Sequence, residues 1–112
     1  MDNMKTYSEF HGNVEINNIG KRLREIVRME KKHFKILTGY GSTGVDSKSK
    51  ASAIKSLSKM KKEGLIKGFL PGEVRYKTLL EKDMFYYDKI EYLSIIKNDP
   101  DYGNEGIIFI FV

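Results

Sequence analysis

A short glycine-rich run carries the clearest chemical signal in the sequence. It lies between a strand-like segment and a basic helix and reads Thr38-Gly39-Tyr40-Gly41-Ser42-Thr43-Gly44. Glycines this close together let the backbone adopt positive φ angles and approach a bound group, so that N–H groups can converge on an anion. Ser42 and Thr43 can donate hydroxyl hydrogen bonds to the same group. The run therefore predicts a phosphate-facing loop.

Other interpretations of this run stay open. It matches the dinucleotide-binding pattern G-x-G-x-x-G, but it follows the second strand-like segment, a polar stretch separates it from the helix, and no acidic residue closes a following strand. A Walker-type loop would need Gly-Lys-Ser/Thr after the glycines, and the sequence lacks it. A Gly/Ser loop without a ligand is the third alternative. Tyr40 could stack on an unpaired base or fold back onto the core.

Glu9 and His11 form the acid/base pair that the sequence places near this loop. An imidazole exchanges protons near neutral pH because its unperturbed pKa is about 6.5. Two residues apart on a strand, the two side chains would point to the same face and could hydrogen-bond or share a metal. The pair is therefore a candidate for proton transfer in RNA cleavage, in which the 2′-OH is the nucleophile. A buried histidine satisfied by the backbone or the loop is the structural alternative.

The sequence predicts no metal site, because Glu9 and His11 supply two ligands and Asp46 would be a speculative third. No cofactor is predicted with certainty, and a divalent metal such as Mg²⁺ stays open. His33 follows the first helical pattern among lysines and is expected at the surface, where the helix dipole favours it. The chain has no cysteine, which excludes disulfides and thiolate sites.

Basic residues surround the glycine-rich run. Residues 13–35 hold seven Lys or Arg against three acids, residues 48–67 hold seven Lys against one acid, and residues 78–105 hold three Lys against seven acids. Lys48, Lys50 and Lys55 would contact phosphates near the N-terminus of the helix after the run. A positive surface beside an anion-binding loop favours a polyanionic partner such as nucleic acid. A solvated lysine surface without a partner is the alternative.

Hydrophobic periodicity predicts the elements that must position these residues. Strands are expected at residues 5–10, 34–37, 65–70 and 107–112, and helices at 14–32 and 49–63, with a further helical segment at 76–98. The order β-α-β-α-β, an extra helical segment and a final apolar strand predicts one small two-layer α/β domain, residues 1–112, with a mixed sheet. Ligands of such sheets bind at the carboxyl ends of strands, where the His-Gly pair and the glycine-rich run are both expected.

Three motifs, in this order and spacing, resemble those of the Smr (small MutS-related) domain. They are Phe10-His11-Gly12 preceded by Glu9, Thr38-Gly39-Tyr40-Gly41, and the turn Gly103-Asn104-Glu105-Gly106 before the last strand. The resemblance covers residues 8–112. It implies binding, and in several members cleavage, of DNA or RNA, with the His-Gly motif and the glycine loop at the functional edge.

The sequence departs from that family's pattern at three places. Glu9 stands at the position of the family's Asp, and Thr38 opens the glycine loop where bacterial members often have His. Residues 76–98 form an insertion relative to a minimal Smr domain. Its acidic character predicts a poor surface for nucleic acid, so the insertion is expected to cap the sheet or to mediate self-association.

The combined expectation is a nucleic-acid-binding Smr-like domain that could also act as an endonuclease on RNA or structured DNA. A noncatalytic RNA- or ribosome-associated module and a protein-interaction domain are the alternatives. Residues 1–10 contain no apolar run, which predicts neither a secretion signal nor a membrane anchor and hence a cytoplasmic protein without a membrane partner. The oligomeric state stays open.

Overall fold

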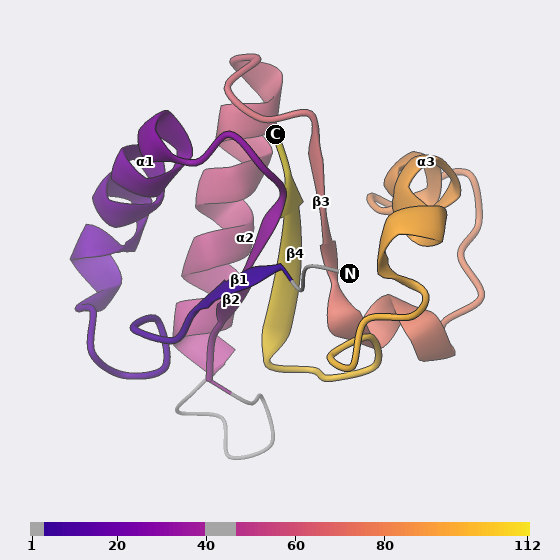
Figure 1. Ribbon diagram of the computed structural model, residues 1–112, viewed down its shortest axis with the longest axis horizontal. Helices are drawn as coiled ribbons and strands as arrows, with labels where there is room; N and C mark the ends of the chain where they lie inside the picture. Colours follow the sequence, from indigo (N-terminus) through magenta and orange to yellow (C-terminus); the bar gives the residue numbers. More distant parts are fainter. Residues whose placement is uncertain (1–3, 40–46) are drawn as a thin grey trace.

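The computed structural model describes residues 4–39 and 47–112 as an α/β domain built on a four-stranded mixed sheet (Figure 1). The elements follow in the order β1 (Lys5–Tyr7), η1 (Ile16–Asn18), α1 (Ile19–Met29), β2 (Phe34–Leu37), α2 (Ser47–Lys62), β3 (Gly68–Pro71), η3 (Gly72–Tyr76), α3 (Tyr86–Ile96) and β4 (Ile107–Phe111). The expected fold class, element order and mixed sheet are confirmed.

The sheet has the strand order β1-β2-β4-β3. β1 pairs parallel to β2, and β4 pairs antiparallel to both β2 and β3, so β1, β2 and β3 all run in one direction. Their carboxyl ends therefore share one edge of the sheet with the start of β4. This edge, called the carboxyl edge below, carries the chain that follows Tyr7, Leu37 and Pro71 and the residues just before Ile107.

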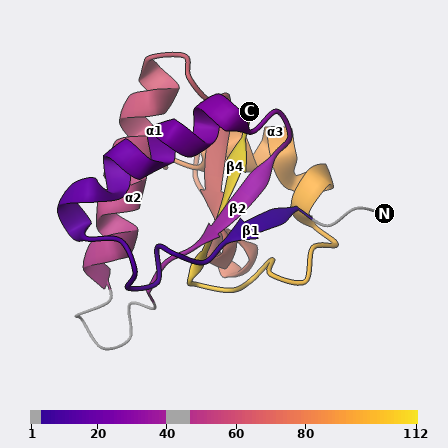
Figure 2. The same cartoon turned by 60° about the vertical axis from the view of Figure 1, so that its left-hand side comes forward.

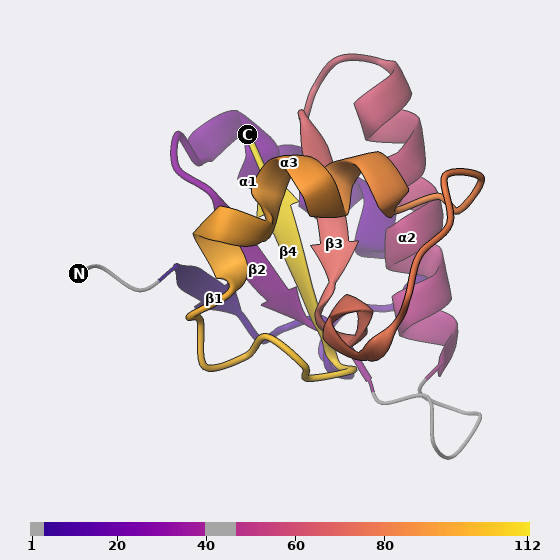
Figure 3. The same cartoon turned by 90° about the vertical axis from the view of Figure 1, so that its right-hand side faces the viewer.

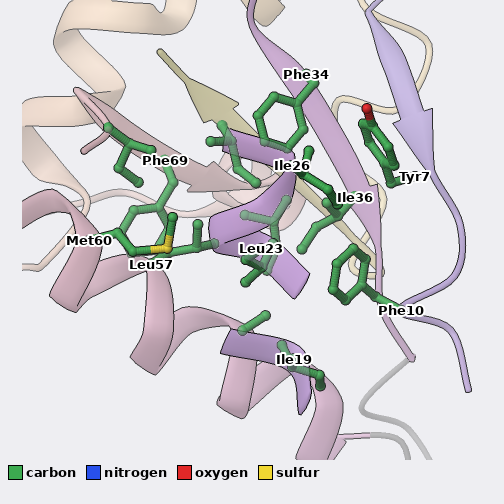
Figure 4. Close-up of a cluster of buried hydrophobic side chains, with 14 residues drawn as sticks. Tyr7, Phe10, Ile19, Leu23, Ile26, Phe34, Ile36, Leu57, Met60 and Phe69 are labelled. Atoms are coloured by element: carbon green, nitrogen blue, oxygen red, sulfur yellow. The ribbon is translucent and has the colours of Figure 1, made fainter. Parts of the chain in front are cut away.

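Two helices cover one face of the sheet because each carries an apolar stripe at helical spacing. In α1 the stripe is Ile19, Leu23 and Ile26, and in α2 it is Ala53, Leu57 and Met60, all fully buried. These side chains pack on Phe34 and Ile36 of β2 and on the inward residues of β3 and β4 (Figure 4). Figure 2 shows α1 and α2 side by side over this face.

The opposite face of the sheet is covered by α3 and η3, which form a second core. Phe109 and Phe111 of β4 point into it, and Tyr92 of α3 stacks on Phe111 with ring centroids 4.1 Å apart. β4 is apolar throughout because both of its faces are covered. Residues 76–98 therefore cap the sheet, the first of their two expected roles, and add a layer to the two expected from the repeating βα units.

A buried lysine lies inside this second layer. Lys35 of β2 is buried and is held by Asp99 at 2.7 Å and by Asp101 at 2.8 Å. Burial alone would lower the pKa of Lys35, but the hydrogen bonds from its ammonium to Asp101 and Asp99 outweigh that effect and raise it. The pairs attach the turn between α3 and β4 to the sheet.

The boundaries of the first elements differ from expectation. β1 ends at Tyr7, and the chain turns from Glu9 onward instead of continuing as a strand to residue 10. The first helix begins with the short η1 and ends at Met29, three residues before its expected end. No helix in the described parts of the chain is long and apolar enough to cross a bilayer.

Candidate nucleic-acid interface

The turn after β1 places Glu9 against α1. Arg22 donates from Nε to Glu9 Oε2 at 2.9 Å and from Nη2 to Oε1 at 3.0 Å, a bidentate pair whose side chains are about one third exposed. The hydrogen bond to Glu9 is the main reason that the pKa of Arg22 is raised. Phe10 points into the core between the two motif residues and fixes the turn.

His11 lies in the same turn, with its side chain exposed. Its backbone N–H donates to the carbonyl of Ser8 at 3.1 Å, and the next residue, Gly12, has φ of +97°, a conformation that favours glycine. The expectation that Glu9 and His11 share one face of a strand is wrong, because β1 has already ended and the chain between them is a turn. The buried-histidine alternative for His11 is wrong as well.

Thr38 and Gly39, the first two residues of the glycine-rich run and called its root below, are held inside the protein by hydrogen bonds. Thr38 is fully buried, and both its N–H, at 2.6 Å, and its hydroxyl, at 3.0 Å, donate to the carbonyl of Gly106. Gly39 N–H donates to the hydroxyl of Ser49 in α2 at 3.1 Å. These bonds join the end of β2 to the start of β4 and to α2. Of the predicted loop residues, Tyr40, Gly41, Ser42, Thr43 and Gly44 lie outside the described residues, as does Asp46.

The structure brings the two motif regions to the same edge. β1 and β2 are parallel and in register from Lys5–Phe34 to Tyr7–Ile36, so the turn with His11 and the Thr38-Gly39 root both leave the sheet at the carboxyl edge. The third motif ends there too, since the Gly106 carbonyl holds Thr38. The expectation that His11 and the glycine-rich loop are neighbours stays a prediction, because the loop from Tyr40 onward lies outside the described residues.

The three predicted lysines of α2 differ in their surroundings. Lys50 forms an ion pair with Glu73 of η3, and its side chain is only 13% exposed. Lys77 approaches the other oxygen of Glu73, at 3.8 Å. Lys48 and Lys55 are exposed. Lys50 thus links α2 to η3, whereas Lys48 and Lys55 face solvent.

A basic groove lies between α1 and α2, and the sequence interpretation did not single it out. It has a volume of about 470 Å³ and is lined by Gly20, Lys21, Arg24, Glu25, Arg28, Ser56 and Lys59. Arg24 also pairs with Glu63 at 2.7 Å. Spacings of three, four and seven residues among the cations of α1 were the available signal, but the groove needs α2 beside them.

His33 does not belong to this edge. It precedes β2, at the opposite end of the sheet, and its Nδ1 accepts a hydrogen bond from the N–H of Val112 at 3.1 Å. It is half-buried, with its ring edge-on to Phe111 at 5.4 Å. Burial, and then the charge of Lys67, lower the pKa of His33. The expectation of a helix-terminal surface residue is therefore wrong, because the helix ends at Met29.

The arrangement offers exposed cations and the exposed imidazole of His11, but no metal centre among the described residues. Within residues 4–39 and 47–112 no group of three or more His, Cys, Asp or Glu side chains could hold a metal ion. Phosphate binding by the exposed cations of α1 and α2 is the chemistry that this part of the molecule can perform.

Comparison with known proteins identifies no relative of this chain. No protein-family model, no curated protein and no solved structure matches it. The similarity to the Smr domain therefore stays a prediction from the three motifs.

Proposed function

We propose that this domain binds nucleic acid through the surface of α1 and α2 that adjoins the carboxyl edge. The basic groove carries the proposal: four cations, Lys21, Arg24, Arg28 and Lys59, line one depression together with the single acid Glu25. Such a cluster contacts phosphates without needing a particular base sequence. The exposed Lys48 and Lys55 extend the positive surface along α2.

The position of the groove supports the same proposal. α2 begins beside the Thr38-Gly39 root, to which Ser49 is hydrogen-bonded. A phosphate backbone lying along α1 and α2 would therefore reach the predicted glycine-rich loop. An Smr-like domain acting on RNA or structured DNA, in the cytoplasm, is the form of the proposal that the three motifs favour.

Cleavage is the second candidate, and the exposed position of His11 at the same edge favours it. Glu9 does not support it as an orienting acid, since its two oxygens accept from Arg22 on α1. Any proton transfer would rest on His11, with the phosphate positioned by the neighbouring cations. Binding without cleavage needs only the basic surface.

Fluorescence anisotropy with labelled single-stranded RNA, an RNA hairpin and duplex DNA tests the binding proposal. Log affinity should fall linearly with log salt concentration, with a slope of about 0.7 to 0.9 per phosphate contact. The triple variant Lys21→Ala, Arg28→Ala and Lys59→Ala should bind more weakly and with a flatter slope. A matched triple variant at the exposed Lys67, Lys82 and Lys97, outside the groove, should keep the parental slope.

Two outcomes would contradict the proposal. One is the absence of binding to all three probes at low salt. The other is an equal loss of affinity in both triple variants, which would mean that total charge matters and the groove does not.

A further inference from the structure

A second groove lies between η3 and α3, in the part of the chain whose acidic composition predicted a poor surface for nucleic acid. Its volume is about 500 Å³. Six of the residues that line it are Arg75, Tyr76, Lys77, Tyr86, Lys89 and Leu93. Among the described residues, none that lines this groove is acidic. The residues that line the groove thus carry a positive charge, whereas residues 78–105 together hold three Lys against seven acids.

Four of the seven acids in residues 78–105 have partners outside the groove. Asp88 accepts from the backbone N–H of Phe69 at 3.2 Å and from Lys61 at 2.9 Å, and Asp99 and Asp101 hold Lys35. Glu81 accepts from the hydroxyl of Tyr87. The acidic composition of this part of the chain therefore does not predict the charge of the groove, which is lined by aromatic and basic side chains.

Tyr76 is the most exposed of the large apolar and aromatic side chains in the described residues, at 73%. The guanidinium carbon of Arg75 lies 5.5 Å from the centre of the Tyr76 ring and 5.7 Å from that of Tyr102, and Arg75 Nη1 donates to the Tyr102 carbonyl at 3.0 Å. An aromatic ring supported by a guanidinium and left open to solvent is a surface on which a nucleobase stacks.

The backbone beneath Tyr76 holds this arrangement in place. Gly103 has φ of +112°, and a Cβ there would lie 2.9 Å from the Tyr76 hydroxyl and 3.1 Å from Cδ of Arg75. Lys89 Nζ donates to the carbonyls of Val74 and Lys77 at 2.7 and 3.0 Å, which ties the end of η3 to α3. The groove is therefore built by hydrogen bonds across two elements.

The groove also adjoins the carboxyl edge. η3 starts directly after β3, and Gly72 O accepts a hydrogen bond from the N–H of Gly103 at 2.9 Å. Figure 3 shows η3 at the end of β3, with α3 above it on the same face of the sheet. A strand of nucleic acid passing along this edge would meet Tyr76.

We infer that the groove between η3 and α3 binds an unpaired base of single-stranded nucleic acid, stacked on Tyr76, with Arg75 and Lys77 next to its phosphates. This inference rests on the proposed function and names the substrate class for it. A base held in a duplex is not available for such stacking, so the groove would distinguish single strands from duplexes, whereas the groove between α1 and α2 would hold either.

The test compares Tyr76→Ala with Tyr76→Phe and with Tyr87→Ala, a matched change at an exposed tyrosine of α3 outside the groove. Affinity is measured by fluorescence anisotropy for a single-stranded RNA, a duplex and an abasic oligonucleotide of the same length. Tyr76→Ala should weaken binding of the single strand by roughly 5- to 150-fold, the loss expected for one stacked base. Tyr76→Phe and Tyr87→Ala should bind as the parent does.

The duplex and the abasic strand test whether binding at Tyr76 requires an unpaired base. Tyr76→Ala should leave the affinity for both unchanged, because neither offers a base to stack. Parental affinity of Tyr76→Ala for the single strand would overturn the inference, and this is also the result expected if the groove takes an apolar peptide instead. An equal loss on all three probes would overturn it as well.

Failure of the inference and failure of the proposed function give different results. The triple variant of the groove between α1 and α2 replaces Lys21, Arg28 and Lys59. If it loses affinity while Tyr76→Ala does not, the inference is wrong and the proposed function stands. If Tyr76→Ala loses the single strand while that triple variant binds normally, the interface on α1 and α2 is wrong. A parent that binds no oligonucleotide overturns both.

Discussion

Arg22 determines what Glu9 can contribute. In sequence Glu9 stands two residues from His11, but in the fold it faces a guanidinium thirteen residues away. The bidentate geometry fixes the turn against α1, which is a structural task. Placed by this turn, His11 reaches solvent at the carboxyl edge. Residue spacing alone could suggest the pair, but it could not show that the acid already has a partner.

Cleavage assays separate the roles of these two residues. If the protein cleaves labelled RNA or branched DNA through His11, His11→Ala should lower the cleavage rate about 100-fold or more with little change in affinity. Glu9→Gln should cut nearly as fast as the parent, because Glu9 contacts Arg22. Parental cleavage by His11→Ala would refute its catalytic role. Binding without cleavage by every variant would favour the noncatalytic module.

His33 makes stability depend on pH. The fold lowers its pKa below the ordinary 6.5, and Nδ1 accepts the Val112 N–H only when it carries no proton. The unfolded chain therefore takes up the proton more readily, so the contribution of His33 is complete above pH 6.5 and is lost as pH falls towards the lowered value. His33→Asn, which can accept the same hydrogen bond but does not titrate, should lose less stability than the parent on acidification.

Thermal unfolding followed by circular dichroism between about pH 7 and about pH 5 measures this difference. All other ionisable residues are common to the two proteins, so only the difference between the two Tm curves reports on His33. Parallel curves would show that His33 binds its proton equally in the folded and unfolded states.

At the scale of elements, α3 is attached to the sheet by one buried carboxylate as well as by apolar packing. Asp88 accepts the Phe69 N–H and the Lys61 ammonium. Asp88→Ala should lower the free energy of unfolding by about 1 to 3 kcal/mol, because it leaves a buried N–H without its acceptor. Asp88→Asn keeps an acceptor oxygen and should cost less. Urea denaturation of the two variants tests this, and equal losses would mean that the charge, not the hydrogen bond, holds α3.

Hydrophobic periodicity predicted the helices and strands, but it could not predict which of them contact one another. The stripes Ile19-Leu23-Ile26 and Ala53-Leu57-Met60 predicted α1 and α2 because burial requires one apolar face per helix. The expected strand at residues 5–10 was too long because Phe10 continues an apolar pattern, although it fills the core from a turn. The basic groove could not be predicted, since it arises where two helices distant in sequence meet.

For the whole molecule, basic and acidic residues that are separated along the sequence meet in ion pairs in the fold. Lys35, Lys50 and Lys61 come from the basic part, and each pairs with an acid from the later part, as described for Asp99, Glu73 and Asp88. Composition therefore overstated the negative charge that the later part of the sequence presents at the surface. It also understated the positive character of the groove at Tyr76, because the cations there lie among acids whose side chains point elsewhere.

Asp88 also covers part of an outer edge of the sheet. β3 is an outer strand of the sheet, and an N–H that an outer strand leaves open is a template for pairing with a strand of another molecule. The carboxylate occupies the N–H of Phe69, and α3 covers Phe109 and Phe111 beside it. Detachment of this one helix would uncover both a strand edge and an aromatic surface. The layer that builds the second groove thus covers surfaces on which a second molecule would otherwise pair.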